Sequence, residues 1–569
     1  MKIVSLLLFL FTALTTRAQT AQRYDILITE LLPDPAPPVG LPNAEFIELF
    51  NRSRTALSLQ QWKISDGSST AVINSPILLP PDSFLIVCAS ANAALFRSYG
   101  TVITVSTFPS LNNDADRITL SDASGRLIHA IEYEQNWYRN PVKEAGGWSL
   151  EMIDTNNPCN GASNWKASTD PNGGSPGKIN SVAGSNPDTD LPVVLHSYFI
   201  DSITCVLQFN ESLDSITASR IDQYTLDGTD RKPLSALPVG PLFKEVWLQW
   251  AEPIERNKRY MLRCNGISDC SGNRIATGTE IATGLSISMR AGDLVINEIL
   301  FNPPPEGADY IEVLNRSTSI LDLKELSIAG RNSQGQIQSV QSATAESRLL
   351  FPGDHILLST QLNWLPIRFS GMPSRRWLQL PSFPSMPDDR GIIVLLNTAG
   401  TIIDELHYEE KWHHPLLDDK ESVALERIDP DAPTQLASNW TSAASTYNYG
   451  TPGYLNSQRL TTAVSSGGSI QITPAIISPN QDGIDDRARI HYKFDLADQL
   501  ATVRIFDSRG RLVRLLKTPH TISAEGYWLW DGLNDSGQKV ATGSYIVLTE
   551  VIHLSGKVRK YRNVVGVRS

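Results

Sequence analysis

The sequence contains few of the features on which enzymes and small disulfide-rich proteins depend. Five cysteines among 569 residues are too few and too scattered for a disulfide scaffold or a zinc site. No phosphate-binding loop, dinucleotide fingerprint, Ser-His-Asp triad or Cys-His pair stands in a recognisable motif. The formal net charge of −11 argues against a phosphate-binding surface, and therefore against a nucleic-acid partner. These absences predict a chain with no catalytic residues and no certain cofactor.

Long apolar runs are also scarce. The run at residues 3–14 follows the basic Lys2 and ends a few positions before Ala18, with small residues where a signal peptidase cuts. A transmembrane anchor needs about 18 or more apolar residues. No cysteine follows the cleavage point, which disfavours a lipid anchor. We expect residues 1–18 to be a signal peptide, and the mature protein to be exported to the cell surface or the medium without a transmembrane segment.

A sustained apolar period of 3.6 residues is missing as well, which disfavours long amphipathic helices. The 35 prolines and 37 glycines are spread along the chain, as in proteins of many short strands joined by turns. The chain is too long for one hydrophobic core. These properties predict an all-β protein of tandem Ig-like β-sandwich domains joined by short linkers.

The strongest positive feature is an internal repeat, a signal of duplicated modules. Matched blocks follow one another in the same order in two regions, and several alternate polar and apolar residues as strands do. The matched pairs are residues 28–32 with 296–300, 45–53 with 309–317, 149–154 with 424–429, 163–165 with 438–440, and 175–181 with 451–457.

These blocks resemble the lamin-tail domain, an Ig-like sandwich that bacteria carry in exported proteins. The resemblance rests on the Ile-x-Glu opening, the Glu-Phe/Tyr-Ile-Glu strand, the Asn-Trp pair and the closing Pro-Gly segment. It covers residues 22–182 and 290–458, which we expect to be two lamin-tail domains. The resemblance implies a fold and an interaction role, and it implies no reaction.

Two further modules follow from composition and resemblance. Residues 187–288 resemble the bacterial Ig-like module of surface-layer proteins. They carry a Phe-Asn-Glu strand end at 209–211 and a late turn at 269–273. Residues 459–469 are a Ser/Gly linker. Residues 470–569 resemble the C-terminal Ig-like module of the gliding-motility and flagellar-hook-capping type. In Bacteroidetes-type bacteria such modules are read by the type IX secretion machinery.

One loop offers ligands for a metal. Asn480, Asp482 and Asp486 supply oxygen atoms around Gly483, and calcium prefers six to eight oxygens. The same residues also form plain turns through hydrogen bonds from side chain to backbone. Calcium and a simple turn both remain open for this loop.

Two glutamates recur in both copies, as Glu30 with Glu48 and as Glu298 with Glu312. A pair of carboxyl groups can perform acid–base catalysis. A catalytic pair needs a cleft, however, and these residues stand on sandwich strands. We therefore expect them to cap backbone groups or to line a strand edge.

The histidines His407, His413 and His414 lie among acidic residues and invite a metal-site interpretation. They form no ordered two-histidine motif on a rigid element, and the first copy lacks them. We expect an exposed loop.

Export permits disulfides. Cys264 and Cys270 flank a turn-rich stretch and are expected to close a loop. Cys88 and Cys159 lie in one module and are expected to form a second bridge, which leaves Cys205 without a predicted partner. Sequence alone fixes no connectivity.

Together these features predict a non-enzymatic surface or extracellular protein with adhesive and structural modules. Its expected partners are the secretion or outer-membrane machinery, through the C-terminal module, and a protein or polysaccharide ligand that the sequence does not identify. The alternative function is an accessory binding protein of an extracellular hydrolase or nuclease system.

Overall fold

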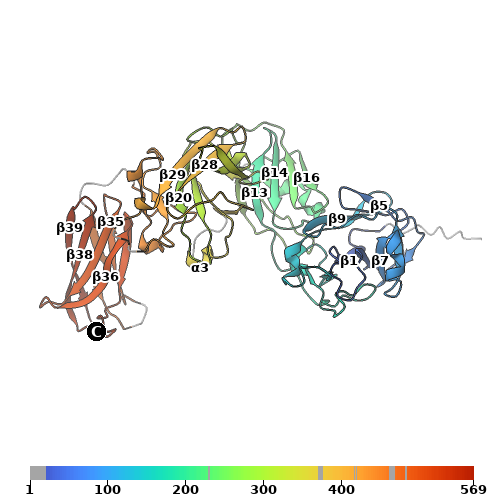
Figure 1. The fold of residues 1–569 in the computed structure, drawn as a ribbon, viewed down its shortest axis with the longest axis horizontal. Coiled ribbons are helices and arrows are strands. Elements are labelled where there is room, and N and C mark those ends of the chain that lie inside the picture. Colours follow the sequence, from blue (N-terminus) through green and yellow to red (C-terminus); the bar gives the residue numbers. More distant parts are fainter. Residues whose placement is uncertain are drawn as a thin grey trace, which may run out of the picture. The chain divides into compact units, whose positions relative to one another are not determined.

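The computed structural model describes residues 21–227, 231–369, 376–415, 417, 419–460, 468–480 and 484–568. The chain divides into two compact units (Figure 1). The first contains Met1–Pro253 and Tyr260–Ala282, and the second contains Ile254–Arg259 and Thr283–Ser569. In the described part of the chain no helix is long and apolar enough to cross a bilayer.

The first copy of the repeat, drawn in blue in Figure 1, pairs a larger sheet of order β12-β11-β1-β2-β7-β8 with a smaller one of order β10-β9-β4-β5. The short strands β3 and β6 form a separate ribbon. The strands are β1 (Ile26–Leu32), β2 (Phe46–Asn51), β3 (Leu57–Ser58), β4 (Lys63–Ser65), β5 (Thr70–Val72), β6 (Leu78–Leu79), β7 (Phe84–Ala89), β8 (Val102–Val105), β9 (Ala115–Ser121), β10 (Leu127–Glu134), β11 (Leu150–Met152) and β12 (Trp165–Ala167).

The helices of this copy are single turns in the connections between strands. They are η1 (Ser90–Asn92), α1 (Ala93–Phe96), η2 (Gln135–Tyr138) and η3 (Gly161–Asn164).

Burial in the first copy differs between its sheets. In β9 and β10 buried and more exposed residues alternate in part, as expected for a strand with one face on the core. In β1 every residue is buried, because this strand lies inside the larger sheet and both sheet faces are covered. One face packs in the main core, and the other contributes Leu32 to a cluster with Phe46 and Phe96 of α1. Its polar residues are therefore buried too.

The second copy repeats this strand order as β31-β30-β20-β21-β26-β27 and β29-β28-β23-β24, with the ribbon β22-β25. Its strands are β20 (Leu294–Leu300), β21 (Tyr310–Asn315), β22 (Leu321–Asp322), β23 (Leu326–Arg331), β24 (Ile337–Ser342), β25 (Leu349–Leu350), β26 (His355–Ser359), β27 (Trp377–Gln379), β28 (Arg390–Asn397), β29 (Ile402–Glu409), β30 (Leu425–Arg427) and β31 (Trp440–Ser442). Its helices are η5 (Leu323–Glu325), α3 (Leu365–Arg368), η7 (Glu410–Trp412), η8 (Ala437–Asn439) and η9 (Ser445–Tyr447).

The segment between the copies forms two facing sheets, β13-β14-β17-β16 and β15-β18-β19. The turn before α2 is capped by Asp214, whose side chain accepts hydrogen bonds from the amides of Ile216 and Thr217 at the N-terminus of α2. The elements are β13 (Val194–Phe199), β14 (Thr204–Phe209), α2 (Ser215–Ala218), η4 (Ile221–Gln223), β15 (Tyr224–Leu226), β16 (Ser235–Val239), β17 (Glu245–Gln249), β18 (Tyr260–Cys264) and β19 (Thr279–Thr283).

The C-terminal segment also forms two sheets, β32-β34-β37 and β33-β39-β38-β35-β36, around a core that includes Trp528 and Trp530. With this segment, the prediction of an all-β chain of tandem sandwiches is confirmed. The strands are β32 (Ser469–Thr473), β33 (Ile476–Ile477), β34 (Ala488–Lys493), β35 (Gln499–Phe506), β36 (Leu512–Ile522), β37 (Glu525–Trp530), β38 (Gly543–His553) and β39 (Val558–Val567).

Candidate functional site

Three glutamates meet inside the larger sheet of the first copy. Glu30 on β1 lies in register with Glu48 on β2 and with Glu151 on β11. All three are 0% exposed, so no substrate reaches them. The sequence indicated the first two; the third stands in a repeated Leu-Glu block but is far away along the chain.

The cluster binds the segment that closes the module. Glu30 accepts hydrogen bonds from the Ser149 hydroxyl at 2.6 Å and from the Ser175 amide at 2.8 Å. Glu48 accepts one from the Gly177 amide at 2.7 Å. The hypothesis that these acids cap backbone groups is therefore confirmed, whereas the strand-edge alternative is wrong because β1 lies between β2 and β11.

Glu151 completes the attachment of this closing segment. It accepts hydrogen bonds from the hydroxyls of Ser175 and Ser181, both at 2.7 Å, and from the Val182 amide at 3.1 Å. Residues 175–182 form no strand of their own. Since buried backbone amides need acceptors, the three carboxyl groups take the place of a strand partner.

The second copy holds its closing segment in the same way. Glu298, Glu312 and Glu426 are each 0% exposed. Glu298 accepts a hydrogen bond from the Thr451 amide, Glu312 from the Gly453 amide at 2.5 Å, and Glu426 from the Gln458 amide at 2.8 Å. The clusters are thus a structural device shared by both copies.

Burial raises the pKa of two acids in each cluster. Burial, followed by the neighbouring carboxyl groups, raises the pKa of Glu30 and of Glu298 well above the ordinary value. Burial also raises the pKa of Glu48 to about 8 and that of Glu426 to about 7. Each cluster therefore retains protons near neutrality, which lowers the repulsion among its carboxyl groups.

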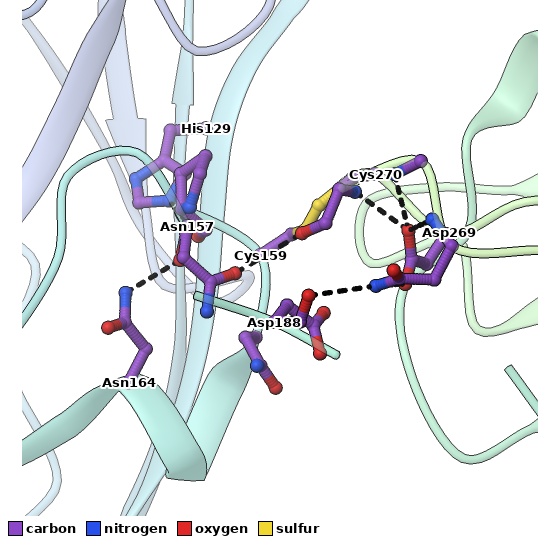
Figure 2. Close-up of a disulfide and its surroundings, with 12 residues drawn as sticks. His129, Asn157, Cys159, Asn164, Asp188, Asp269 and Cys270 are labelled. Carbon is purple, nitrogen blue, oxygen red and sulfur yellow. Dashed lines mark hydrogen bonds between the residues drawn. A yellow bond between two sulfur atoms is a disulfide. The ribbon is translucent and has the colours of Figure 1, made fainter. Parts of the chain in front are cut away.

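A disulfide joins two modules of the first unit (Figure 2). It links Cys159, in the loop after β11, to Cys270, in a turn after β18. Their Cα atoms are 6.4 Å apart, within the range that a disulfide spans. The bridge therefore ties the first copy of the repeat to the segment that follows it.

The predicted pairings Cys264–Cys270 and Cys88–Cys159 are therefore wrong. Cys264 ends a strand and points into the sandwich core, where burial raises the pKa of its thiol. Cys88 lies on β7 in the cluster that contains Phe96. Both thiols are buried, whereas Cys159 and Cys270 are partly exposed on loops that face each other.

Hydrogen bonds reinforce this junction. The Asn157 side chain donates to the backbone oxygen of Asn186 at 3.0 Å and accepts from the Ser271 hydroxyl at 3.4 Å. The Asn273 side chain donates to the backbone oxygen of Asp188 at 3.2 Å. The linker between the two modules is consequently bonded to both of them.

A buried histidine contacts the loop that carries Cys159. His129 on β10 is 0% exposed. One ring nitrogen accepts from the Ile28 amide at 2.9 Å, and the other lies 3.1 Å from the Pro158 carbonyl. Burial lowers the pKa of His129 to about 4. The neutral ring therefore donates to the carbonyl of Pro158, the residue before Cys159. Figure 2 shows His129 together with the disulfide.

Three carboxyl groups gather beside the junction. Asp188, Glu211 and Asp269 each offer one oxygen, and these oxygens lie within 4.8 Å of one another. Burial, followed by the charges of Asp188 and Asp269, raises the pKa of Glu211 to about 7. These are ligand types that calcium accepts. The sequence had shown the turn at Asp269 but not its approach to the linker.

The loop predicted to hold calcium is described only in part, since Asp482 lies outside the described residues. Near it the Ser478 amide donates to the Asp485 carbonyl at 2.8 Å, and the Asn480 amide donates to the Ser478 carbonyl at 2.7 Å. These are turn contacts. The calcium assignment of Asn480, Asp482 and Asp486 stays a prediction.

The expected exposure of the histidines in the second copy is wrong for two of the three. His413 and His414 are 3% and 1% exposed, because they pack against Ser442 of β31, which lies 2.9 Å from the His413 ring. Burial lowers the pKa of His413 to about 3. His407 is exposed and lies 2.7 Å from Glu405.

Comparison with known proteins gives one family match. Residues 19–135 match the family model of the Lamin Tail Domain. A search of curated proteins returns no significant match.

A search of solved structures returns matches to parts of the chain. The N-terminal part of the bacterial S-layer protein SbsC is 16% identical over 29% of this chain and 45% of its own, with a TM-score of 0.16. A longer SbsC structure is 13% identical over 67% of this chain and 54% of its own, with a TM-score of 0.16. A Ca2+-stabilized adhesin of an Antarctic bacterium is 9% identical over 96% of this chain and 100% of its own, with a TM-score of 0.12. The chain spans about half the length of the S-layer structures that it matches.

Proposed function

We propose that this is a non-enzymatic exported protein of the cell surface or the extracellular space, whose sandwiches serve as spacers and adhesion modules. The observation that carries the proposal is the disulfide between Cys159 and Cys270. Disulfides persist in oxidising compartments outside the cytosol. A bridge between two modules also suits a protein that must keep its modules in order outside the cell.

The repeated glutamate clusters support a structural role. Glu30 and Glu298 are repeated acids of the kind that a hydrolase would need, yet both are sealed from solvent and bonded to the closing segments. We assign the second copy, residues 290–458, as a further lamin-tail domain because it repeats the strand order of the first.

The last module, residues 470–569, is assigned to type IX-like secretion or to attachment at the cell surface. Its deletion should leave the chain in the periplasm, while the full chain reaches the surface or the medium. Cell fractionation with an antibody against the first module measures this. Cleavage of the signal peptide after Ala18 in both forms is the control that the first export step is intact. Unchanged surface delivery of the shortened chain would refute the sorting role.

The second candidate function is an accessory binding protein of an extracellular hydrolase or nuclease system. Nuclease, protease and glycosidase assays of the purified full chain address catalysis directly. The non-enzymatic proposal expects no turnover. Turnover that a single substitution abolishes would overturn it.

A further inference from the structure

A groove opens on the smaller sheet of the second copy, with a volume of about 620 Å³. Its walls come from the end of β23, the edge strand β24, the start of β28, the end of β29 and the proline-rich segment 384–387. Pockets of this size suit one or two rings of a small ligand.

The first copy has an ion pair at the corresponding strand positions. Tyr133 and Tyr408 mark equivalent positions, because each donates its hydroxyl to a loop carbonyl at 2.7 and 2.9 Å respectively. One residue before Tyr133, Glu132 lies opposite Arg117 in register, and the two side chains pair at 2.6 Å.

The same register positions in the second copy hold two residues that form no ion pair with each other. One residue before Tyr408, His407 lies opposite Ile392, and both line the groove. The second copy thus has one apolar side chain, Ile392, and a histidine where the first has a salt bridge. The two copies otherwise share one strand order. The replacement of the ion pair therefore indicates a role that only the second copy performs.

The charges around the groove are balanced by their neighbours. Arg331 makes two hydrogen bonds to the Glu405 carboxylate, at 2.9 and 2.7 Å, and His407 lies 2.7 Å from the same carboxylate. Glu409 pairs with Lys411 at 2.5 Å. Arg390, which also lines the groove, lies 3.7 Å from Asp389. Since each of these charges has a partner of opposite sign, the groove offers little net attraction for a phosphate or another strongly charged ligand.

Uncharged polar groups remain for a ligand. Ser333, Gln338, Ser339 and Ser385 line the groove, and within the described residues their side chains make no hydrogen bond to protein. Ile392 and the nearby prolines add apolar surface. Hydroxyl and amide groups beside a small apolar floor match the two sides of a sugar ring, which has hydroxyls at its rim and C–H groups on its face.

We propose that this groove binds a neutral, hydroxyl-rich polysaccharide through one or two of its sugar rings. The inference rests on the proposed adhesive function and names the ligand class for it. An extended peptide along the edge strand β24 is the competing occupant. It is disfavoured because Ser339 has a left-handed backbone, φ +53°, which interrupts the flat edge that strand addition requires.

The test is isothermal titration of the full chain with cellohexaose, xylohexaose and mannohexaose. At least one of these neutral hexasaccharides should bind. The double substitution Ile392→Arg with His407→Glu copies the ion pair of the first module into the groove, and should weaken binding about tenfold or more. Gln338→Ala with Ser385→Ala, on the exposed rim, should weaken it as well and guards against misfolding of the first variant.

The matched control is the reverse exchange in the first copy, Arg117→Ile with Glu132→His, which should leave binding unchanged. Absence of binding by all three hexasaccharides would overturn the inference. Preferential binding of hexagalacturonate or of an extended peptide would also overturn the inference. Wild-type affinity for the saccharide in both groove variants would overturn it too. Fractionation of the same variants separates the two proposals, because normal surface delivery without saccharide binding refutes the groove alone.

Discussion

Tyr310 donates its phenolic hydrogen to Glu298 across 2.5 Å inside the second glutamate cluster. The equivalent residue of the first copy is Phe46, because it occupies the same register position, two residues before the cluster glutamate on the second strand. Phenylalanine has no hydroxyl group and cannot donate. The Oε2 atom of Glu30 is buried and has no hydrogen-bond partner among the described residues. The Tyr310 hydroxyl is therefore one donor of the second cluster that the first cluster lacks.

Exchange of these two residues should have opposite effects. Tyr310→Phe leaves Glu298 with one donor fewer and should lower the free energy of unfolding of the second copy by about 1–3 kcal/mol. Phe46→Tyr supplies the missing donor to Glu30 and should stabilise the first copy by up to about 1 kcal/mol. Urea denaturation measures both, with Tyr527→Phe at an exposed position as the control. Equal destabilisation by the two exchanges would contradict this account.

The buried glutamates make stability fall as the pH rises. The folded-state pKa of Glu48, about 8, and that of Glu426, about 7, lie above the ordinary value for glutamate. Their contribution to stability is therefore complete below the unfolded-state pKa and is lost as the pH rises through the folded-state pKa. Between those values each group should lower the free energy of unfolding by about 1.4 kcal/mol per pH unit.

Urea denaturation at several pH values tests this dependence. Glu48→Gln and Glu426→Gln should each flatten the profile of their own module, because the amide keeps the shape and does not ionise. Glu132→Gln, on the exposed outer face, serves as the control. A profile that rises with pH in the wild type would refute the prediction.

Removal of the Cys159–Cys270 disulfide should lower the free energy of unfolding of the first unit. The double substitution Cys159→Ser with Cys270→Ser opens a loop of sequence separation 111, and should destabilise the unit by about 2–5 kcal/mol. Limited proteolysis should then cut the linker at residues 183–189 faster than in the wild type. Peptide mapping without reduction checks the connectivity directly. A cross-linked peptide joining Cys264 to Cys270 would show that the assignment is wrong.

The carboxyl group of Glu211 should weaken the module junction at alkaline pH. Its pKa of about 7 is raised by burial and by Asp188 and Asp269, so its stabilising contribution is lost as the pH rises through that value. Glu211→Gln should raise the melting temperature above pH 7 and change it little under acidic conditions. Glu245→Gln, on a neighbouring strand, is the control. If Glu211→Gln changed the melting temperature equally under acidic and alkaline conditions, ionisation of Glu211 would not be the cause.

Calcium in the last module can be tested by chelation. If the loop at residues 480–486 binds calcium, a chelator should lower the melting temperature of residues 470–569, and added calcium should restore it. Asp486→Asn should abolish the response. Differential scanning calorimetry of the full chain measures both, and a chelator response that Asp486→Asn leaves intact would place the ion elsewhere.

Local sequence pattern predicted some residues of the buried glutamate clusters and missed others. The recurrence of Glu30 and Glu48 in the second copy identified two members of each cluster. Glu151 could not be joined to them, because it lies far along the chain and reaches β1 only through the strand order. His413 was misassigned for a related reason. Polar neighbours in the sequence suggested exposure, whereas Ser442 and Phe301 from distant segments enclose it.

The sequence by itself determined the all-β class and the duplication, because alternating strands, turn residues and repeated blocks are local properties of the chain. Only the tertiary structure decided which cysteines meet, which acids are buried and which residues line the groove of the second copy. Cys159 and Cys270 are separated by 111 positions, and the acids of each cluster come from three strands. Their contacts follow from strand order and loop placement, which depend on the packing of the whole module.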